Sequence, residues 1–318
     1  MSSIITDFQE TLRSREAKNP QNQLVLQTIR SLSAAFVYPE PTNVETNRKL
    51  WDEYAKSWDN DGDWVQTMAG HVGMQKKLEH VGDEWSDSES LEQVLSEFLF
   101  PHLLKNGVVA EIGTGGGRVA CRVAPVCLSF TCMDVSIEML KRAKSVLDPL
   151  STLTKNKPNI KYVHLKGDPS TIPDKFNATY DFIYSFDVFV HLDLHTIWGY
   201  MKTMHRMLKD GGKIFLSTSN ILAPLGWQRF AKQTKYTVGG FYFISPDIAK
   251  KMAIEMGFHV IQESSWDKNT NNVYYERDYL FVLEKKNSDD ISKEEGGEQE
   301  GGGQECTSGG SSSVNEKD

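Results

Sequence analysis

A glycine-rich turn is the segment of this chain best suited to hold a ligand. Residues 111–117 read Glu-Ile-Gly-Thr-Gly-Gly-Gly and continue an apolar segment, residues 108–112, that has the character of a buried strand. Glycine lets the backbone turn sharply and approach a bound molecule more closely than a residue with a side chain can. We therefore expect this turn to border a ligand site between a strand and the following helix.

Two acidic residues follow at the ends of the next two predicted strands. Asp134 lies 17 residues past Gly117 and ends the strand over 128–133, while Asp168 follows the strand over 160–165. A carboxylate after the second strand can accept hydrogen bonds from both hydroxyls of a ribose. Because open α/β sheets bind ligands at the carboxyl ends of their strands, we expect the turn and both acids to line one crevice.

The elements that must position these residues alternate between strand and helix from residue 90 to residue 286. Helices are predicted over 90–104 and 194–208, and further helices begin at the capping residues Ser136 and Ser245. The predicted strands cover 108–112, 128–133, 160–165, 182–185, 213–217, 258–263 and 275–283. This order predicts an α/β fold, a Rossmann-like seven-stranded, mostly parallel sheet with helices on both faces and an N-terminal helical cap.

Over residues 90–286 the chain resembles the class I S-adenosylmethionine-dependent methyltransferases. The resemblance rests on the glycine turn, Asp134, Asp168 and the segment Leu-Lys-Asp-Gly-Gly at 208–212. It implies S-adenosyl-L-methionine as cofactor, with the turn around its methionine part, Asp134 on its ribose and Asp168 on its adenine amino group. The cofactor-binding residues that we assign on this basis are Glu111, Gly113, Gly115, Gly117, Asp134, Met139, Asp168 and Ser185.

A second group of chemically capable residues follows the fourth predicted strand. Residues 185–192 read Ser-Phe-Asp-Val-Phe-Val-His-Leu, and in the methyltransferases that the chain resembles this region faces the transferable methyl group. A hydroxyl acceptor needs a base, whereas an amine can arrive already neutral. His191 titrates near neutrality and suits the role of base, so we take His191 and Asp187 as candidate catalytic residues. The alternative is that His191 enters a helix and is satisfied by hydrogen bonds.

The same segment is similar to the site of the ubiquinone-biosynthesis O-methyltransferases, in which two acids and a histidine hold a metal ion. Asp187 and His191 match two of those positions, and Val190 stands where the other acid would be. We therefore expect no metal at this site.

The function that we predict is methyl transfer to oxygen or nitrogen of a small-molecule acceptor. The alternatives are a non-catalytic methyltransferase-fold partner subunit and a protein methyltransferase, which is disfavoured because no Asn-Pro-Pro-Tyr motif follows the fourth strand. A nicotinamide dehydrogenase is disfavoured because Arg118 stands where its fingerprint has Gly or Ala. A polyamine synthase would have a carboxylate after the fourth strand, and Asp187 keeps that alternative open.

Aromatic residues are concentrated in two segments outside the predicted core. Trp51, Tyr54 and Trp58 have a helical spacing that fits either a lid over the site or an amphipathic helix packed on the sheet. Residues 219–244 form a connection that is long for an α/β fold and rich in aromatic side chains. We interpret this connection as an element that covers the substrate.

Composition and charge exclude several functions for this chain of 318 residues. Its formal net charge is −8, and residues 288–318 carry nine acidic residues and two lysines, so the remainder is nearly neutral. The nearly neutral charge of residues 1–287 argues against nucleic acid as a partner. No apolar run approaches the ~20 residues of a membrane span, so we expect no membrane partner. The four cysteines form no CxxC pair and no apolar leader is present, which favours a cytoplasmic protein.

The composition also divides the chain into four segments. We expect a flexible N-terminus over 1–20, a helical and aromatic cap over 21–89, and a methyltransferase domain over 90–287. Residues 288–318 are rich in Gly, Ser and Glu and lack apolar residues that could pack, so we expect a disordered acidic tail. The sequence carries no signal for an oligomeric state.

Overall fold

The computed structural model describes residues 43–286, apart from residues 64, 66, 68–77, 155–156 and 269–270. All of the described residues belong to one compact unit, which begins at residue 43. The predicted flexible N-terminus, the predicted tail over 288–318 and a helix that the apolar spacing predicts up to Val37 lie outside the described residues.

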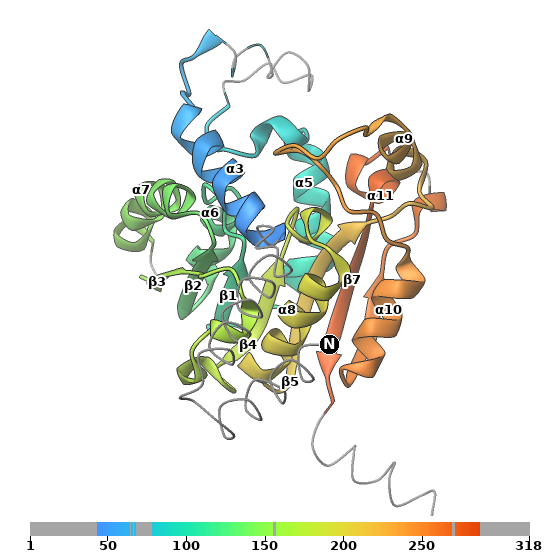
Figure 1. The fold of residues 1–318 in the computed structure, drawn as a ribbon. Helices are drawn as coiled ribbons and strands as arrows, with labels where there is room; N and C mark the ends of the chain where they lie inside the picture. Colours follow the sequence, from blue (N-terminus) through green and yellow to red (C-terminus); the bar gives the residue numbers. More distant parts are fainter. Residues whose placement is uncertain are drawn as a thin grey trace, which may run out of the picture. The chain divides into compact units, whose positions relative to one another are not determined.

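A seven-stranded sheet forms the centre of the described unit (Figure 1). Its strand order is β3-β2-β1-β4-β5-β7-β6, and neighbours are parallel except where β7 runs antiparallel to both β5 and β6. The strands are β1 (Val108–Ile112), β2 (Ser129–Asp134), β3 (Asn159–His164), β4 (Tyr180–Ser185), β5 (Leu208–Ser219), β6 (Phe258–Glu263) and β7 (Asp278–Lys285). The predicted Rossmann-like, mostly parallel sheet is thereby confirmed.

Helices lie between the strands in the order that the sequence predicts. The longer ones are α3 (Asn43–Ser57), α5 (Ser88–Val94), α7 (Ile137–Leu153), α8 (Leu194–Met207), α9 (Pro224–Lys232) and α10 (Pro246–Glu255). The shorter ones used below are η1 (Asp83–Trp85), η2 (Leu95–Leu99), α6 (Ala120–Val123), η5 (Pro169–Thr171), η7 (Phe189–His191) and α11 (Val273–Arg277). Helix α3 confirms that a helical segment precedes the core.

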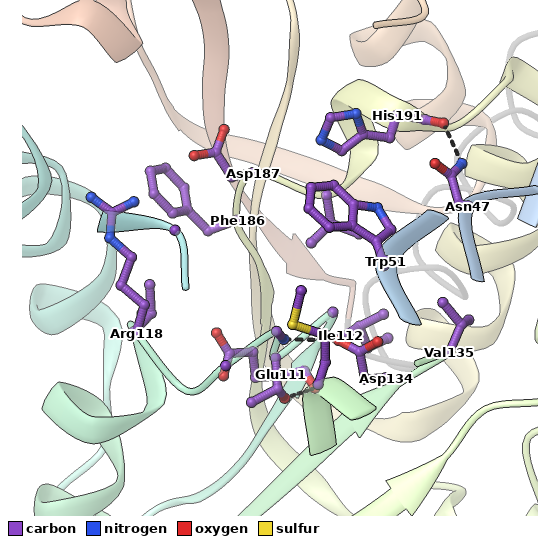
Figure 2. Close-up of a pocket in the computed structure, with 18 of the residues that line it drawn as sticks. Asn47, Trp51, Glu111, Ile112, Arg118, Asp134, Val135, Phe186, Asp187 and His191 are labelled. Atoms are coloured by element: carbon purple, nitrogen blue, oxygen red, sulfur yellow. Dashed lines mark hydrogen bonds between the residues drawn. The ribbon is translucent and has the colours of Figure 1, made fainter. Parts of the chain in front are cut away.

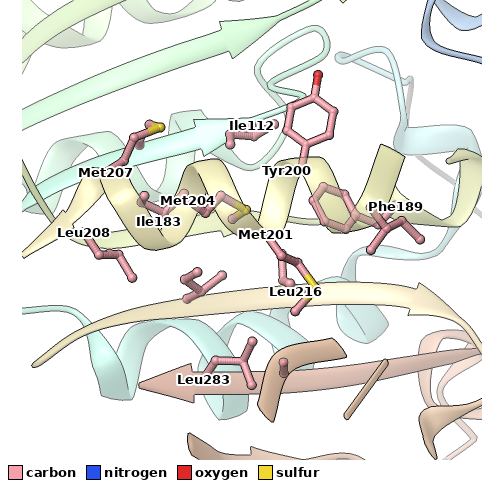
Figure 3. Close-up of a cluster of buried hydrophobic side chains, with 14 of the residues drawn as sticks. Ile112, Ile183, Phe189, Tyr200, Met201, Met204, Met207, Leu208, Leu216 and Leu283 are labelled. Carbon is pink, nitrogen blue, oxygen red and sulfur yellow. The ribbon is translucent and has the colours of Figure 1, made fainter. Parts of the chain in front are cut away.

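Alternate residues of the central strands supply two hydrophobic cores, because successive side chains of a strand point to opposite faces. Helices α8 and α10 cover one face, where Met201 and Met204 of α8 pack with Ile183 and Leu216 (Figure 3). Ile197 of α8 belongs to the same core. These three α8 residues recur at helical spacing and so form one apolar face of the predicted helix. The other face is covered by α5, η2, α6, α7 and α11.

The start of β5 differs from the prediction, which placed a turn at Asp210-Gly211-Gly212 before a strand beginning at Lys213. Leu208 already pairs with Tyr180, and the next pair is Lys213 with Phe182. Five residues of β5 therefore span the same distance as two residues of β4, so residues 209–212 bulge out of the ladder. Gly211 has φ +68°, a backbone conformation that glycine adopts without steric cost.

The last strand, in contrast, begins later than predicted. Residues 273–277 form the short helix α11, so β7 starts at Asp278 and not at Tyr275. The side chain of Asn272 caps α11 by accepting a hydrogen bond from the backbone N–H of Tyr274 at 3.0 Å. An asparagine cap competes with the extended backbone that the aromatic residues favour, and here the cap prevails.

Helix α3 lies beside α7 near the carboxyl ends of β1 and β2 (Figure 1). The Asp52 carboxylate accepts hydrogen bonds from Ser136 Oγ at 2.6 Å and from the Glu138 N–H at 3.4 Å. Arg142 of α7 donates to the carbonyl oxygens of Ala55 at 2.8 Å and Trp58 at 2.6 Å, at the end of α3. These bonds satisfy the last carbonyls of α3 and fix the helix over the ligand end of the sheet.

Candidate functional site

A cavity of about 140 Å³ lies at the carboxyl ends of β1, β2 and β4 (Figure 2). The predicted site residues that line it are Glu111, Gly113, Gly115, Asp134, Met139, Asp187 and His191. Glu111 and Asp134 lie on one side of Trp51, and Asp187 and His191 lie on the other. The cavity therefore brings together residues from three strands and from α3.

The glycine turn requires glycine for two different reasons. Gly113 has φ +78°, and a Cβ atom there would lie 2.3 Å from Cγ2 of Val188, closer than two carbon atoms can approach. Gly115 has φ +55°, and a Cβ atom there would meet nothing within 4 Å. Gly113 thus permits the packing of the turn on the segment after β4, whereas Gly115 leaves open space for a ligand.

Asp134 ends β2 and is held by two backbone groups. Its Oδ2 accepts from the Gly115 N–H and its Oδ1 from the Ser136 N–H, both at 2.8 Å. Burial raises the pKa of this carboxyl to about 6, and the two backbone hydrogen bonds oppose the rise. Each carboxylate oxygen accepts more than one hydrogen bond, so Asp134 keeps capacity for hydroxyl donors of a ligand.

Glu111 supplies a second buried carboxyl, at the end of β1. It is 2% exposed, and its Oε2 has no hydrogen-bond partner among the described residues. Burial raises its pKa well above the ordinary value for a glutamate. Because Glu111 also lines the cavity, a ligand there could supply a donor or a cation to this carboxyl.

Asp187 stands at the opposite side of the cavity in an unusual backbone conformation, with φ +60°. Its N–H donates to Ser217 Oγ at 2.8 Å, and its Oδ1 forms an ion pair with Arg277 at 2.6 Å. Oδ2 is buried and has no hydrogen-bond partner among the described residues. Left-handed residues that are not glycine cluster at binding sites, where surrounding contacts hold them.

His191 is buried in η7. The prediction that it titrates near neutrality is wrong. Burial lowers the pKa of its imidazole to about 4, so the ring is neutral at pH 7. Nδ1 lies 2.7 Å from the Gly240 carbonyl, which can only accept, so Nδ1 carries the proton and Nε2 keeps a lone pair. Trp51 and Phe241 each pack against the ring at 5.4 Å between ring centroids.

Three residues assigned to the cofactor do not line this cavity. Ser185 is buried and donates its hydroxyl to the Ile112 carbonyl at 2.7 Å, so it joins β4 to β1. Asp168 caps η5 by accepting from the Ser170 N–H at 2.8 Å. Gly117 packs on α7, where a Cβ atom would lie 3.2 Å from Cα of Ala143. The adenine contact of Asp168 therefore stays a prediction.

Arg118 lines the cavity, although the sequence interpretation used it only to disfavour a dehydrogenase. It is 6% exposed and donates to the Tyr274 hydroxyl at 3.0 Å and to Ser86 Oγ at 2.9 Å. Its Nε lies 3.3 Å from an Asp83 carboxylate oxygen. The available signal was an arginine directly after the glycines, in the turn that precedes the short helix α6.

The aromatic residues of α3 and Trp58, which follows directly after it, lie in different surroundings. Trp51 lines the cavity, whereas Trp58 is 3% exposed and belongs to a small core between α3 and α7. The Tyr54 hydroxyl donates to Glu84 at 2.6 Å. Within the described residues, no three His, Cys, Asp or Glu side chains are grouped as a metal site would require.

Comparison with known proteins identifies the family. Residues 83–263, more than half of the chain, match the model of a methyltransferase domain. Magnesium protoporphyrin IX methyltransferase from Synechocystis, solved with S-adenosylhomocysteine, has a TM-score of 0.52 at 12% identity, over 75% of this chain and 97% of that one. Its structure with S-adenosylmethionine has a TM-score of 0.51 at 13% identity, over 78% and 100%.

A methyltransferase from Methanosarcina mazei has a TM-score of 0.46 at 16% identity, over 59% of this chain and 99% of that one. A search of curated proteins finds no match. The sheet and its glycine turn define a Rossmann-like methyltransferase fold. The chain belongs to the methyltransferase domain family, within the class I S-adenosylmethionine-dependent methyltransferases. No helix among its described residues combines the length and the apolar character needed to cross a bilayer.

Proposed function

We propose that this protein transfers a methyl group from S-adenosylmethionine to an oxygen or nitrogen atom of a small-molecule acceptor. The observation that carries the proposal is one cavity lined both by the glycine turn with two buried acids and by Asp187 and His191. Family membership supports the cofactor, and the cavity supports the division into a cofactor side and an acceptor side.

The residues on the cofactor side fit S-adenosylmethionine in chemistry. The open space at Gly115 leaves room for the ligand beside the backbone, and Asp134 has acceptor capacity left for ribose hydroxyls. The unpaired Oε2 of Glu111 suits the ammonium group of the methionine part. When bound, the cofactor supplies an electrophilic methyl group on a sulfonium. Met139 would pack against it, and Asp168 is proposed for the adenine amino group.

On the acceptor side, His191 is the proposed base. Its ring is neutral at pH 7 and keeps a lone pair at Nε2, so it can accept a proton from a hydroxyl acceptor, although the burial that lowers its pKa also makes it a weaker base. Asp187, held by Arg277, is proposed to orient the acceptor through its free Oδ2. An amine acceptor that arrives neutral would need only this positioning.

The enclosure of the cavity supports a small acceptor. Trp51 of α3 and Trp85 of η1 line it, and α3 is bonded to α7 and to the His191 carbonyl. We also propose that residues 90–287 form the catalytic domain and that the segment before it acts as the cap.

Calorimetric titration of S-adenosylmethionine into the purified protein is the first test, followed by transfer of labelled methyl groups to small-molecule extracts. We expect saturable binding of one cofactor per chain and labelled product in the wild-type reaction. A folded protein that binds neither S-adenosylmethionine nor S-adenosylhomocysteine would overturn the proposal. Cofactor binding without transfer to any small molecule would favour the partner-subunit alternative.

A further inference from the structure

A second cavity, of about 660 Å³, borders the acceptor side of the first. It is formed by α9, the segment 233–240 that follows it, η1 and α11. Trp85 lines both cavities. Gly240, in the wall of the second, accepts the hydrogen bond from His191, and Arg277 pairs with Asp187. A molecule reaching past Trp85 would therefore have one end at His191 and the other in the second cavity.

The second cavity presents donors and positive charge. Its basic lining residues are Arg229, Lys232, Lys235 and Arg277, and Glu84 is the acidic lining residue among those described. Both oxygens of Glu84 are already engaged, one by the Tyr54 hydroxyl at 2.6 Å and the other by the Gly82 N–H at 2.7 Å. A cationic ligand would find no free carboxylate on this described surface.

The two arginines differ in how their charge is compensated. Arg277 is paired with Asp187 and Asp278, each at 2.6 Å. Arg229 donates to the Gly239 carbonyl, but no described acid lies within ion-pair distance of it. Its Nε is buried and has no hydrogen-bond partner among the described residues. A buried guanidinium N–H without a partner is costly unless a ligand satisfies it.

Packing holds Arg229 in this position. Its guanidinium carbon lies 3.9 Å from the centroid of the Phe241 ring, and that of Arg277 lies 5.1 Å from the same ring. Gln233 bonds both the N–H and the carbonyl of Phe241 at 2.8 Å, which fixes the ring. Burial and the neighbouring Arg277 charge lower the pKa of Arg229, and the Asp278 and Asp187 carboxylates offset this only in part. A bound anion would offset both effects.

We propose that the methyl acceptor carries an acidic group, a carboxylate or a phosphate, which Arg229 binds in the second cavity. Guanidinium groups recognise these planar or tetrahedral oxyanions with paired N–H donors. Lys232 and Lys235 add positive potential at the same wall, and the acceptor's nucleophilic atom lies toward Asp187 and His191. This inference rests on the proposed function and narrows its substrate to anionic small molecules.

Anion binding can be measured before the acceptor is known. Benzoate and inorganic phosphate are titrated into the protein with S-adenosylhomocysteine present, at constant ionic strength. We expect at least one of them to bind, and Arg229→Gln to weaken that binding about 10-fold to 100-fold. Arg229→Lys keeps the charge and should recover part of the affinity. Lys202→Gln, at an exposed position of α8 outside both cavities, is the matched control and should bind like the wild type.

Equal affinity in the wild type and Arg229→Gln, or no binding of either anion to the wild type, overturns the inference. If Arg229→Gln does not fold, the test is the anion affinity of Arg229→Lys together with the salt dependence of anion binding to the wild type. An ionic contact weakens as the salt concentration rises. Affinity that is unchanged in Arg229→Lys and independent of salt also overturns it.

The acceptor itself supplies a separate test. A small-molecule extract is divided by anion exchange, and each fraction is offered with labelled S-adenosylmethionine. We expect labelled product from the retained, anionic fraction, and loss of that product after phosphatase treatment identifies a phosphate whereas survival identifies a carboxylate. Product from the unretained fraction alone overturns the anionic substrate but leaves the methyltransferase intact. Failure to bind S-adenosylmethionine removes the proposed function instead.

Discussion

At the scale of single residues, burial sets the ionisation of the groups around the cavity. It lowers the pKa of His191 to about 4 and raises that of Asp134 to about 6, because the charged form of each group loses hydration. At pH 7 the histidine is therefore neutral and Asp134 is mostly ionised. These are the states in which one side chain can accept a proton and the other can accept hydrogen bonds from hydroxyls.

Replacement of His191 distinguishes the possible acceptors. For a hydroxyl acceptor, His191→Ala should lower turnover by about 10²–10⁴-fold, the usual worth of a positioned base, with cofactor affinity near wild type. Wild-type turnover should fall as pH drops through about 4, where the imidazole takes up its proton, and not through about 6.5. Steady-state kinetics and a pH–rate profile are the measurements.

The control is His195→Ala, because His195 is exposed on α8 and should be replaceable without loss. A folded His191→Ala protein that keeps full activity on the true acceptor would remove the histidine from catalysis. The same pKa also predicts a stability effect. Between about pH 6.5 and 4 the unfolded chain binds the proton and the folded protein does not, so the free energy of unfolding should decrease as the pH is lowered.

Replacement of Asp134 tests the cofactor side. Asp134→Ala should weaken S-adenosylmethionine binding by about 1.5–3 kcal/mol for each hydrogen bond lost to the charged group, or about 10-fold to 150-fold. Wild-type affinity should also fall as pH drops through about 6, because a protonated carboxyl accepts fewer hydrogen bonds. Calorimetry on folded protein measures both. Asp148→Ala, at an exposed site on α7, is the control, and unchanged affinity of Asp134→Ala would exclude the ribose contact.

At the scale of elements, substitutions in the glycine turn can distinguish a glycine needed for cofactor binding from one needed for folding. Gly115→Val should fold with a strain of order 1–3 kcal/mol from its positive φ, because nothing lies near the new Cβ, and should lose S-adenosylmethionine binding by filling the open space. Gly113→Ala should lower the melting temperature more, because its Cβ would collide with Val188. Scanning calorimetry and cofactor titration on both variants compare these effects. Cofactor affinity retained by Gly115→Val would contradict the assignment.

Local patterns predict the elements whose own residues determine them. The strand Val108–Ile112 and the cap at Ser136 follow from apolar character and capping chemistry, and the Ser136 hydroxyl does accept from the Met139 N–H at 3.1 Å. The start of β5 at Leu208 depends on its pairing with Tyr180 of another strand. Such a pairing between distant residues leaves no periodic signal, so the prediction began this strand five residues late.

At the scale of the whole molecule, the sequence predicts that residues 288–318 contribute nothing to folding or catalysis. They lack apolar side chains that could pack, and they carry most of the formal negative charge. A chain ending at Lys286 should keep the melting temperature and the turnover of the full-length protein. Thermal unfolding and steady-state assays of both forms provide the comparison. A marked loss of melting temperature or of turnover would show that residues 288–318 bind to the rest of the chain.

The sequence predicted which residues line the cavity better than it predicted the pKa values and ion pairs of those residues. Seven of the predicted residues line the cavity, because the glycine turn and the strand ends are local features. The lowered pKa of His191 and the buried Nε of Arg229 without a hydrogen-bond partner among the described residues depend on elements far apart in the chain. The ion pair of Asp187 with Arg277 joins residues 90 positions apart, a distance over which single-sequence patterns carry no information.

Two of the elements that border the acceptor side come from the two ends of the described unit. Trp51 belongs to α3 and Arg277 to α11, and both lie outside residues 83–263, the part that matches the family model. The glycine turn and Asp134 lie inside it, and so do Asp187, His191 and Arg229. In evolutionary terms, flanking segments that pack on an inherited core can change in sequence. The substrate preference of the enzyme can then change while the cofactor site is preserved. Relatives that share the core would then be expected to methylate chemically different acceptors, and similarity within the core would not transfer a substrate from one to another.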